Sequence, residues 1–134
     1  MSEKSKRDLI KLIWSRLPKW ECKRKCQASC RAWFCTEVEW RMIIEKGGER
    51  YAKSFFDPCP YLNERGLCDV YEVRPTICRL WGCVESMRCP YGCKPSKILT
   101  DEQGREVLKL VSDVDKGKVS TEEQVLRRLE AIGL

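Results

Sequence analysis

The chain of 134 residues contains no histidine. Without an imidazole side chain it cannot build a Ser–His or Cys–His nucleophile pair, or a catalytic zinc site that uses histidine ligands. It also offers no glycine-rich loop of the kind that holds nucleotide cofactors, and no obvious acid–base pair. These absences disfavour an enzyme, and we rank an enzymatic function last.

Long apolar runs are absent as well. No uninterrupted stretch approaches the ~18 apolar residues of a membrane span, and the basic N-terminus lacks the apolar segment and small-residue cleavage site of a secretory signal. We therefore expect a cytoplasmic protein that forms one domain over residues 1–134. In a reducing cytosol thiols stay available as thiolates, so a high cysteine content indicates metal binding, with a disulfide framework as the alternative.

Positive charge is concentrated at the N-terminus. The first 35 residues carry ten Lys or Arg against three Asp or Glu, although the net charge of the whole chain is only +6. Residues 1–19 predict a basic amphipathic helix, because Leu9, Ile10 and Ile13 recur at helical spacing ahead of Pro18. We favour a helix that packs on the protein's own core. The alternative is a helix that binds an acidic protein or nucleic acid.

Six of the ten cysteines lie between residues 59 and 93. Five prolines in and beside this stretch prevent long helices, although residues 70–73 could form one short strand. We expect residues 20–95 to form a loop-rich, metal-binding cysteine core.

The N-terminal cysteines follow a different pattern. On a helix through residues 21–34, Cys22, Cys26 and Cys30 would share one face and Cys35 would point away from it. A straight helix separates Cys22 from Cys30 by roughly 12 Å along its axis, whereas two sulfurs on one zinc ion lie within about 4.6 Å of each other. All three therefore cannot bind one ion unless the helix breaks. Either two sites or a larger cluster must share them.

Two stretches carry a recognisable motif: Cys59-Pro60-Tyr61-Leu62, and Cys-Asp-Val-Tyr-Glu-Val-Arg-Pro-Thr-Ile-Cys-Arg over residues 68–79. They resemble the YkgJ-type cysteine-cluster family, described as zinc- or iron-chelating. Its pattern is Cys-Pro-x-Leu, then Cys-x-Ile-Tyr-x-x-Arg-Pro-x-x-Cys-Arg. The chain looks like a branch that has Cys-x-x-x-Cys-x-x-x-Cys in place of the usual Cys-x-x-Cys-x-x-Cys-Cys opening. That branch also carries Arg-Cys-Pro-x-Gly-Cys, matched here by residues 88–93.

The resemblance covers roughly residues 20–110 and implies a set of core metal ligands. These are Cys22, Cys26, Cys30, Cys59, Cys68, Cys78, Cys89 and Cys93. Cys35 and Cys83 are then second-rank candidates.

Cations and turn residues surround these ligands. We expect Arg74 and Arg79 to stabilise the negative charge of a thiolate site and to lower the pKa of its thiols. Pro75 is expected to shape the turn that returns Cys78 towards Cys68, with Tyr71 beside the site.

All-sulfur ligation selects iron–sulfur clusters or closed zinc sites. The Cys-Pro pairs at Cys59 and Cys89 are similar to ferredoxin-type ligands, and a cubane spans more space than one ion. We therefore favour an iron–sulfur cluster, of the [4Fe–4S] type, that serves electron transfer or redox sensing. The alternative is a zinc-stapled interaction module whose basic face binds nucleic acid or an acidic partner.

Three capping boxes predict helix starts, at residues 36–39, 100–103 and 120–123. The first helix should end at Gly47, and the other two belong to a C-terminal helical scaffold over residues 96–134. The predicted fold is therefore mainly α. We expect a small, metal-stapled domain whose helices pack around a loop-rich cysteine cluster, with little or no sheet.

Overall fold

A computed structural model describes residues 1–19, 35–47, 59, 61, 63–65, 67–90 and 92–134. These residues are mainly helical, as predicted. In chain order the elements are α1 (Glu3–Arg16), α2 (Glu37–Glu45), the 3-10 turn η2 (Tyr71–Val73), α3 (Thr76–Leu80), α4 (Asp101–Asp115) and α5 (Glu122–Ala131). The helix predicted over residues 21–34 lies outside the described residues.

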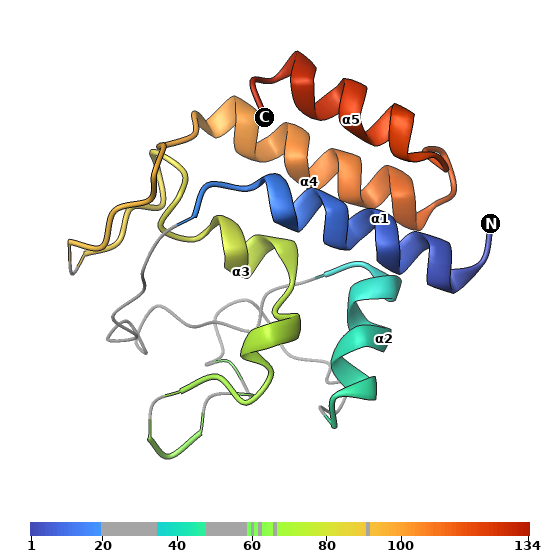
Figure 1. Ribbon diagram of the computed structural model, residues 1–134. Coiled ribbons are helices and arrows are strands. Elements are labelled where there is room, and N and C mark those ends of the chain that lie inside the picture. The colour runs from blue at the N-terminus through green and yellow to red at the C-terminus, as the bar shows by residue number, and fades with distance from the viewer. Residues whose placement is uncertain (20–34, 48–58, 60, 62, 66, 91) are drawn as a thin grey trace.

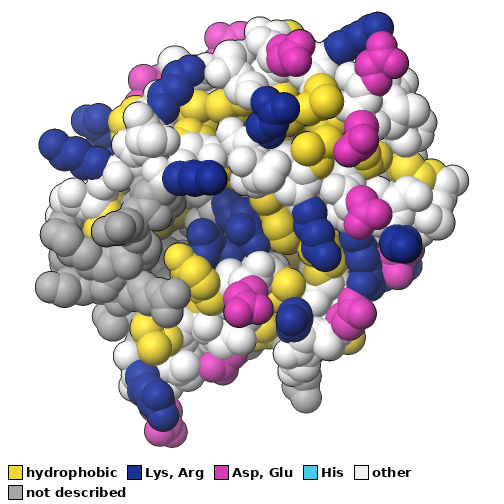
Figure 2. Space-filling view, in the orientation of Figure 1, with side chains coloured by type: hydrophobic (Ala, Val, Ile, Leu, Met, Phe, Trp, Pro, Cys, Tyr) yellow, Lys and Arg dark blue, Asp and Glu magenta, His cyan; other side chains and the backbone are white. Residues whose placement is uncertain are grey.

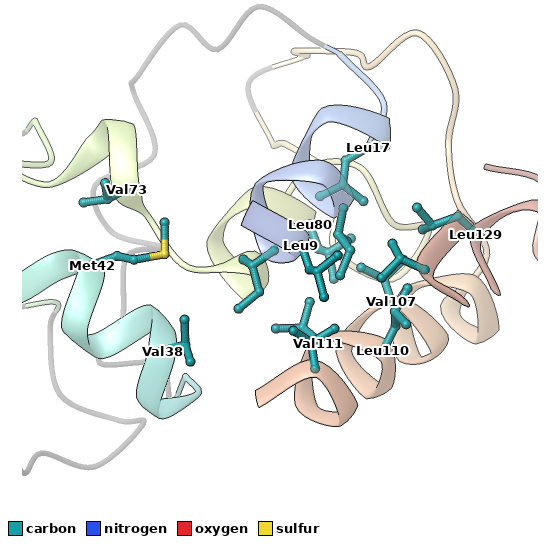
Figure 3. Packing of buried hydrophobic residues seen from close by; sticks show 14 of the residues in the cluster. Leu9, Leu17, Val38, Met42, Val73, Leu80, Val107, Leu110, Val111 and Leu129 are labelled. Atoms are coloured by element: carbon teal, nitrogen blue, oxygen red, sulfur yellow. The ribbon is translucent and has the colours of Figure 1, made fainter. Parts of the chain in front are cut away.

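Helices α1, α4 and α5 lie side by side and form the main layer of the molecule (Figure 1). Their facing sides are apolar at helical spacing, so packing them together removes a continuous apolar surface from water. The side chains buried in this layer are Leu9, Ile10, Ile13, Val107, Leu110, Val111, Val114, Val125 and Leu129. Figure 3 shows Leu9, Leu17, Val107, Leu110 and Leu129 meeting between the three helices.

The predicted basic helix is confirmed as α1. It is capped by Ser2, whose Oγ accepts a hydrogen bond from the backbone N–H of Ser5, and it ends ahead of Pro18. Several of its cations bind the protein itself: Lys6 Nζ donates to the carbonyl of Asp115 at 2.6 Å, and Arg7 pairs with Glu45. The helix therefore packs on the protein's own core, which is the arrangement that the sequence favours.

Helix α2 packs against α1 on one side and η2 on the other. Its capping box is confirmed, with Thr36 as N-cap and Glu39 as the third helical residue. The helix ends before Gly47, whose φ of 91° is a conformation that residues with a side chain rarely adopt. Val38 and Met42 on α2 belong to the same buried cluster as Val73 and Leu9 (Figure 3), so the core continues beyond the main helical layer.

The strand predicted over residues 70–73 is wrong. These residues form the 3-10 turn η2, in which the N–H of Val73 bonds to the carbonyl of Val70 at 3.0 Å. Both valines are buried, at 4% and 9% exposure. Residues three apart share a face in a 3-10 turn, whereas in a strand they would point to opposite faces. The short helix α3 follows directly, and the proline pattern did not predict it.

The capping boxes of the C-terminal scaffold are both present, one of them shifted. Thr100 and Gln103 cap α4 as predicted. The third box begins at Thr121, one residue later than expected, and uses Gln124 as its partner. The sequence offers an acceptor side chain at both 123 and 124, so pattern alone did not fix the register. None of the described helices is long and apolar enough to cross a membrane.

One ion pair joins the two scaffold helices. Arg128 Nη1 lies 2.6 Å from Asp113 Oδ2, and this hydrogen bond holds the pKa of the Asp113 carboxyl below its usual range. A carboxyl whose pKa is lowered by folding stabilises the protein above the unfolded pKa of ~3.9 and loses that effect as pH falls through the folded pKa. The pair is part-buried, with 31% of the Arg128 side chain and 15% of the Asp113 side chain exposed, and water still screens it, so its contribution is about 1 kcal/mol.

We therefore expect Asp113→Asn to lower the free energy of unfolding at pH 7, and the difference from wild type to shrink as pH falls below the unfolded pKa of ~3.9 and to vanish once pH is below the folded pKa. Urea unfolding at several pH values measures both. Glu123→Gln, which breaks the fully exposed pair with Arg127, is the control and should have little effect. A constant difference across this pH range would contradict the role given to Asp113.

Candidate metal centre

Four cysteines from three separate parts of the chain line one cavity. The cavity has a volume of ≈ 30 Å³. Its walls are Cys35, Trp40, Ile43, Cys59, Tyr61, Cys68, Val70, Arg74, Pro75 and Cys78. We call it the cysteine cavity. Cysteines that are far apart in the sequence come together here because α2, η2 and α3 pack around the loop that contains Cys59 and Cys68.

Backbone hydrogen bonds fix the positions of the four cysteines. Cys35 directly precedes Thr36, the N-cap of α2. Cys59 and Cys68 lie on opposite arms of a loop that is closed by a bond from the N–H of Asp69 to the carbonyl of Tyr61, at 2.9 Å. Cys78 lies in the first turn of α3, where its N–H bonds to the carbonyl of Pro75. Cys35, Cys68 and Cys78 therefore lie next to or within hydrogen-bonded backbone, and Cys59 lies two residues before Tyr61, whose carbonyl closes the loop.

Several opposing effects act on the pKa of the Cys68 thiol, and burial is the largest of them. Burial raises its pKa, and the nearby Cys59 thiolate raises it further, whereas a hydrogen bond from the backbone of Val70 and the charge of Arg74 lower it. A thiol with a raised pKa holds its proton at neutral pH, and a bound cation would displace that proton. Arg74 is the cation that the structure places in the wall of the cavity, beside this thiol.

The arginine predicted to accompany Arg74 has a different environment. The Arg79 guanidinium lies 3.7 Å from the centroid of the Trp14 ring and donates to the carbonyls of Arg74 and Glu72, so it braces the turn between η2 and α3. Burial and the charge of Arg74 lower its pKa to about 10, which leaves it charged at neutral pH. Arg79 does not line the cavity. Figure 2 shows basic side chains in a hollow in the region of α3.

Tyr71 and Pro75, which the sequence predicts beside the ligands, both lie next to Arg74. The Arg74 guanidinium stacks on the Tyr71 ring at 3.9 Å, so the ring limits the orientations of the guanidinium. Pro75 is the N-cap of α3 and lines the cavity. The turn that it begins brings Cys78 and Cys68 to the same cavity.

The described cysteines outside the cavity differ among themselves. Cys83 is fully buried, its Sγ donates to the carbonyl of Pro18 at 3.8 Å, and burial raises its pKa to about 11, which suits a packed core thiol. Cys89 and Cys93 do not line the cavity. They belong to a segment that is held near the N-terminal helix by a bond from the N–H of Ser96 to the carbonyl of Lys19, at 2.8 Å. Cys22, Cys26 and Cys30 lie outside the described residues.

The cysteine cavity has the donors of a metal site without the compact geometry of a filled one. Within the part of the chain that the structure describes, no three cysteine or carboxylate side chains converge tightly enough to hold one ion. No disulfide joins two of these cysteines. Four thiols around one small cavity nevertheless match the donor set of a tetrathiolate centre.

One cysteine of the cavity, Cys35, is only a second-rank ligand candidate on the sequence. The family resemblance leaves it outside the core ligands, and a continuous helix over residues 21–34 would turn it away from the other N-terminal cysteines. In the structure it lines the cavity with three cysteines that lie more than twenty residues downstream.

Comparisons of the chain with protein-family models, with curated proteins and with solved structures return no match. The resemblance to the YkgJ-type family therefore stays a prediction that rests on the motifs alone.

Proposed function

We propose that this protein is a metal-binding cysteine-cluster protein, and that Cys35, Cys59, Cys68 and Cys78 hold one of its metal centres. The observation that carries this proposal is the meeting of four thiols, from distant parts of the chain, around one cavity. Soft thiolate ligands select zinc and iron–sulfur clusters over hard cations. The absence of histidine leaves thiolates as the soft donors of the chain.

We propose that the bound metal is an iron–sulfur cluster, and that the protein uses it for electron transfer or redox sensing. Four cysteines are the ligand number of a [4Fe–4S] cluster, and Cys59 stands in a Cys-Pro pair of the ferredoxin type. Apolar side chains such as Trp40 and Ile43 line the cavity beside the thiols. A wall of this kind limits the access of water, which is one of the protein's means of setting a cluster potential.

The second candidate is a structural zinc ion in the same thiols. Four thiolates are the ligand set of a closed, tetrahedral structural zinc site, so the same four cysteines also suit zinc. A structural zinc ion is not redox-active, so a protein stabilised by it would function by binding a partner on its surface. On the basic helix α1, Lys6 and Arg7 are bonded within the protein, whereas Lys4 and Lys11 are exposed and remain available to nucleic acid or an acidic partner.

The ligand assignment is tested by thiol reactivity. In the protein as purified without oxygen, we expect Cys35, Cys59, Cys68 and Cys78 to resist alkylation together and to become reactive together when a chelator removes the metal. Mass spectrometry of the alkylated peptides reports each cysteine separately. Rapid alkylation of these four thiols while the protein keeps its metal would exclude the cysteine cavity as the site.

Arg74 should tune the affinity of this centre. Its guanidinium lines the cavity, lowers the pKa of Cys68 and, among the described residues, forms no ion pair with a carboxylate. Residues next to metal ligands typically change metal affinity by about 10–100-fold. We expect Arg74→Gln to weaken binding by about tenfold and Arg74→Lys to weaken it less, because the charge remains.

Competition with a chromophoric chelator measures these affinities. Arg105→Gln, an exposed charge change on α4, is the matched control and should leave the affinity unchanged. Equal metal affinities for Arg74→Gln and the control would contradict a role for Arg74 in stabilising the thiolates.

A further inference from the structure

The strongest polar feature behind the cysteine cavity is a buried carboxylate. Glu39 lies in the first turn of α2 and is 2% exposed. Glutamate is rarely buried to this extent, because a carboxylate that leaves water needs strong partners in exchange. A capping box alone does not require such burial, since the corresponding side chain of α5, Gln124, is exposed.

The two oxygens of Glu39 bind two different helices. Oε1 accepts hydrogen bonds from the backbone N–H and the hydroxyl of Thr36, at 3.1 and 2.9 Å. Oε2 accepts the backbone N–H and the hydroxyl of Thr76, at 2.6 and 2.8 Å. Thr36 caps α2 and Thr76 is the first residue of α3. One carboxylate thus joins the starts of both helices.

A third helix joins the same network. The indole N–H of Trp14, on α1, donates to the hydroxyl of Thr76 at 2.8 Å. That hydroxyl therefore accepts from Trp14 while it donates to Glu39. The Arg79 guanidinium stacks on Trp14, and its charge interacts with the Glu39 carboxylate. Buried polar networks whose members are all bonded fix one arrangement of the elements that they join.

This arrangement bears directly on the thiols. Cys35 is the residue before Thr36, and Cys78 is two residues after Thr76. Trp40 and Pro75, the neighbours of Glu39 and Thr76 along the chain, line the cavity. The Glu39 carboxylate therefore links the backbone segment that carries Cys35 to the segment that carries Cys78. Through these bonds it sets the distance between the two segments.

We propose that Glu39 is a positioning residue of the metal centre, which holds Cys35 and Cys78 at the separation that metal binding requires. This inference rests on the proposed function. Glu39 does not touch the metal. It acts through Thr36 and Thr76, and it makes the site preorganised, so that the binding free energy is not consumed in bringing the two helices together.

The test is Glu39→Gln in the full chain. A glutamine has the same shape but presents one NH₂ group, and this donor must face the donors of either Thr36 or Thr76. Metal-free, reduced protein is titrated with Zn²⁺ alone, and the protection of Cys35 and Cys78 from alkylation is followed by mass spectrometry. We expect the Zn²⁺ concentration at half-protection to rise by about 10–100-fold in the variant.

A matched control removes a cap that is far from the thiols. Gln124→Ala deletes the corresponding side chain of the α5 capping box and should leave the half-protection concentration unchanged. If Glu39→Gln does not fold, as judged by its helical circular dichroism, the pair Thr76→Val and Thr76→Ser takes its place. The serine keeps the hydroxyl and should restore protection, whereas the valine should not.

The possible outcomes distinguish failure of the metal centre from failure of the positioning role of Glu39. Wild-type protein whose Cys35 and Cys78 are never protected by Zn²⁺ would overturn the proposed metal centre itself. Protection at the same Zn²⁺ concentration in wild type and in Glu39→Gln would leave the centre intact and overturn the positioning role. Equal shifts in Glu39→Gln and Gln124→Ala would assign the effect to general loss of stability and would also overturn that role.

Discussion

Replacement of Cys68 or Cys78 by serine is expected to release the metal from the cysteine cavity and to destabilise the part of the protein that surrounds it. A serine hydroxyl is a poor ligand for zinc or for iron–sulfur clusters, so either change leaves an incomplete ligand set. In thiolate sites of this kind the free energy of metal binding is also free energy of folding, about 10–16 kcal/mol for zinc in small zinc fingers.

The loss should not be uniform over the molecule. Helices α1, α4 and α5 bury their own apolar faces against one another and do not need the cavity. Helices α2 and α3 and the turn η2 are short, and they surround the thiols. We therefore expect hydrogen exchange to speed up in residues 35–45 and 67–80 in both variants, while α4 and α5 stay protected.

Metal analysis and hydrogen exchange by mass spectrometry provide the two readouts. Full metal content and unchanged exchange in both Cys68→Ser and Cys78→Ser would remove these residues from the ligand set.

The second large effect is expected at Cys35. Because it lines the cavity with Cys59, Cys68 and Cys78, Cys35→Ser should release the metal as completely as Cys78→Ser does. The helix pattern of the sequence predicts the opposite, a mild effect. Structure and sequence therefore make different forecasts for one substitution.

Cys83→Ala is the matched control for this experiment. Cys83 is buried and bonded to Pro18, away from the cavity walls. Its replacement should lower the free energy of unfolding by roughly 1–2 kcal/mol through lost packing, with no loss of metal. Metal analysis of the two variants side by side decides the matter. Metal retention in Cys35→Ser would return Cys35 to the second rank of ligand candidates.

The sequence was most informative where structure is determined locally. The periodicity of Leu9, Ile10 and Ile13 identified α1, and the capping boxes gave the N-caps of α2 and α4, Thr36 and Thr100, correctly. Such features depend on hydrogen bonds between residues three or four apart, so the local sequence carries the whole signal.

The cysteine cavity could be predicted only in part. The motif indicated Cys59, Cys68 and Cys78, and the structure brings these three to one place. The fourth thiol, Cys35, arrives through tertiary contacts. The hydrogen bond from Thr76 to Glu39 joins residues 37 positions apart. No sequence pattern within α2 or within α3 predicts it.

The turn η2 and helix α3 were missed for a related reason. Val70 and Val73 suit a strand by propensity. Both side chains are buried in the same core, which a 3-10 turn allows and a strand does not. This burial depends on the packing of η2 against α2. Burial of this kind is set by tertiary contacts, which local propensity does not contain.

The measurement that tests the central claim most directly is the metal and acid-labile sulfide content of the full chain purified without oxygen, together with its visible spectrum. The proposal predicts bound iron with matching sulfide and a broad absorption band near ~400 nm, both lost in Cys68→Ser. A colourless protein with tightly bound zinc would keep the thiolate centre and replace the cluster by the structural ion. A protein that contains neither metal, and gains none when its reduced thiols are offered iron or zinc, would contradict the account.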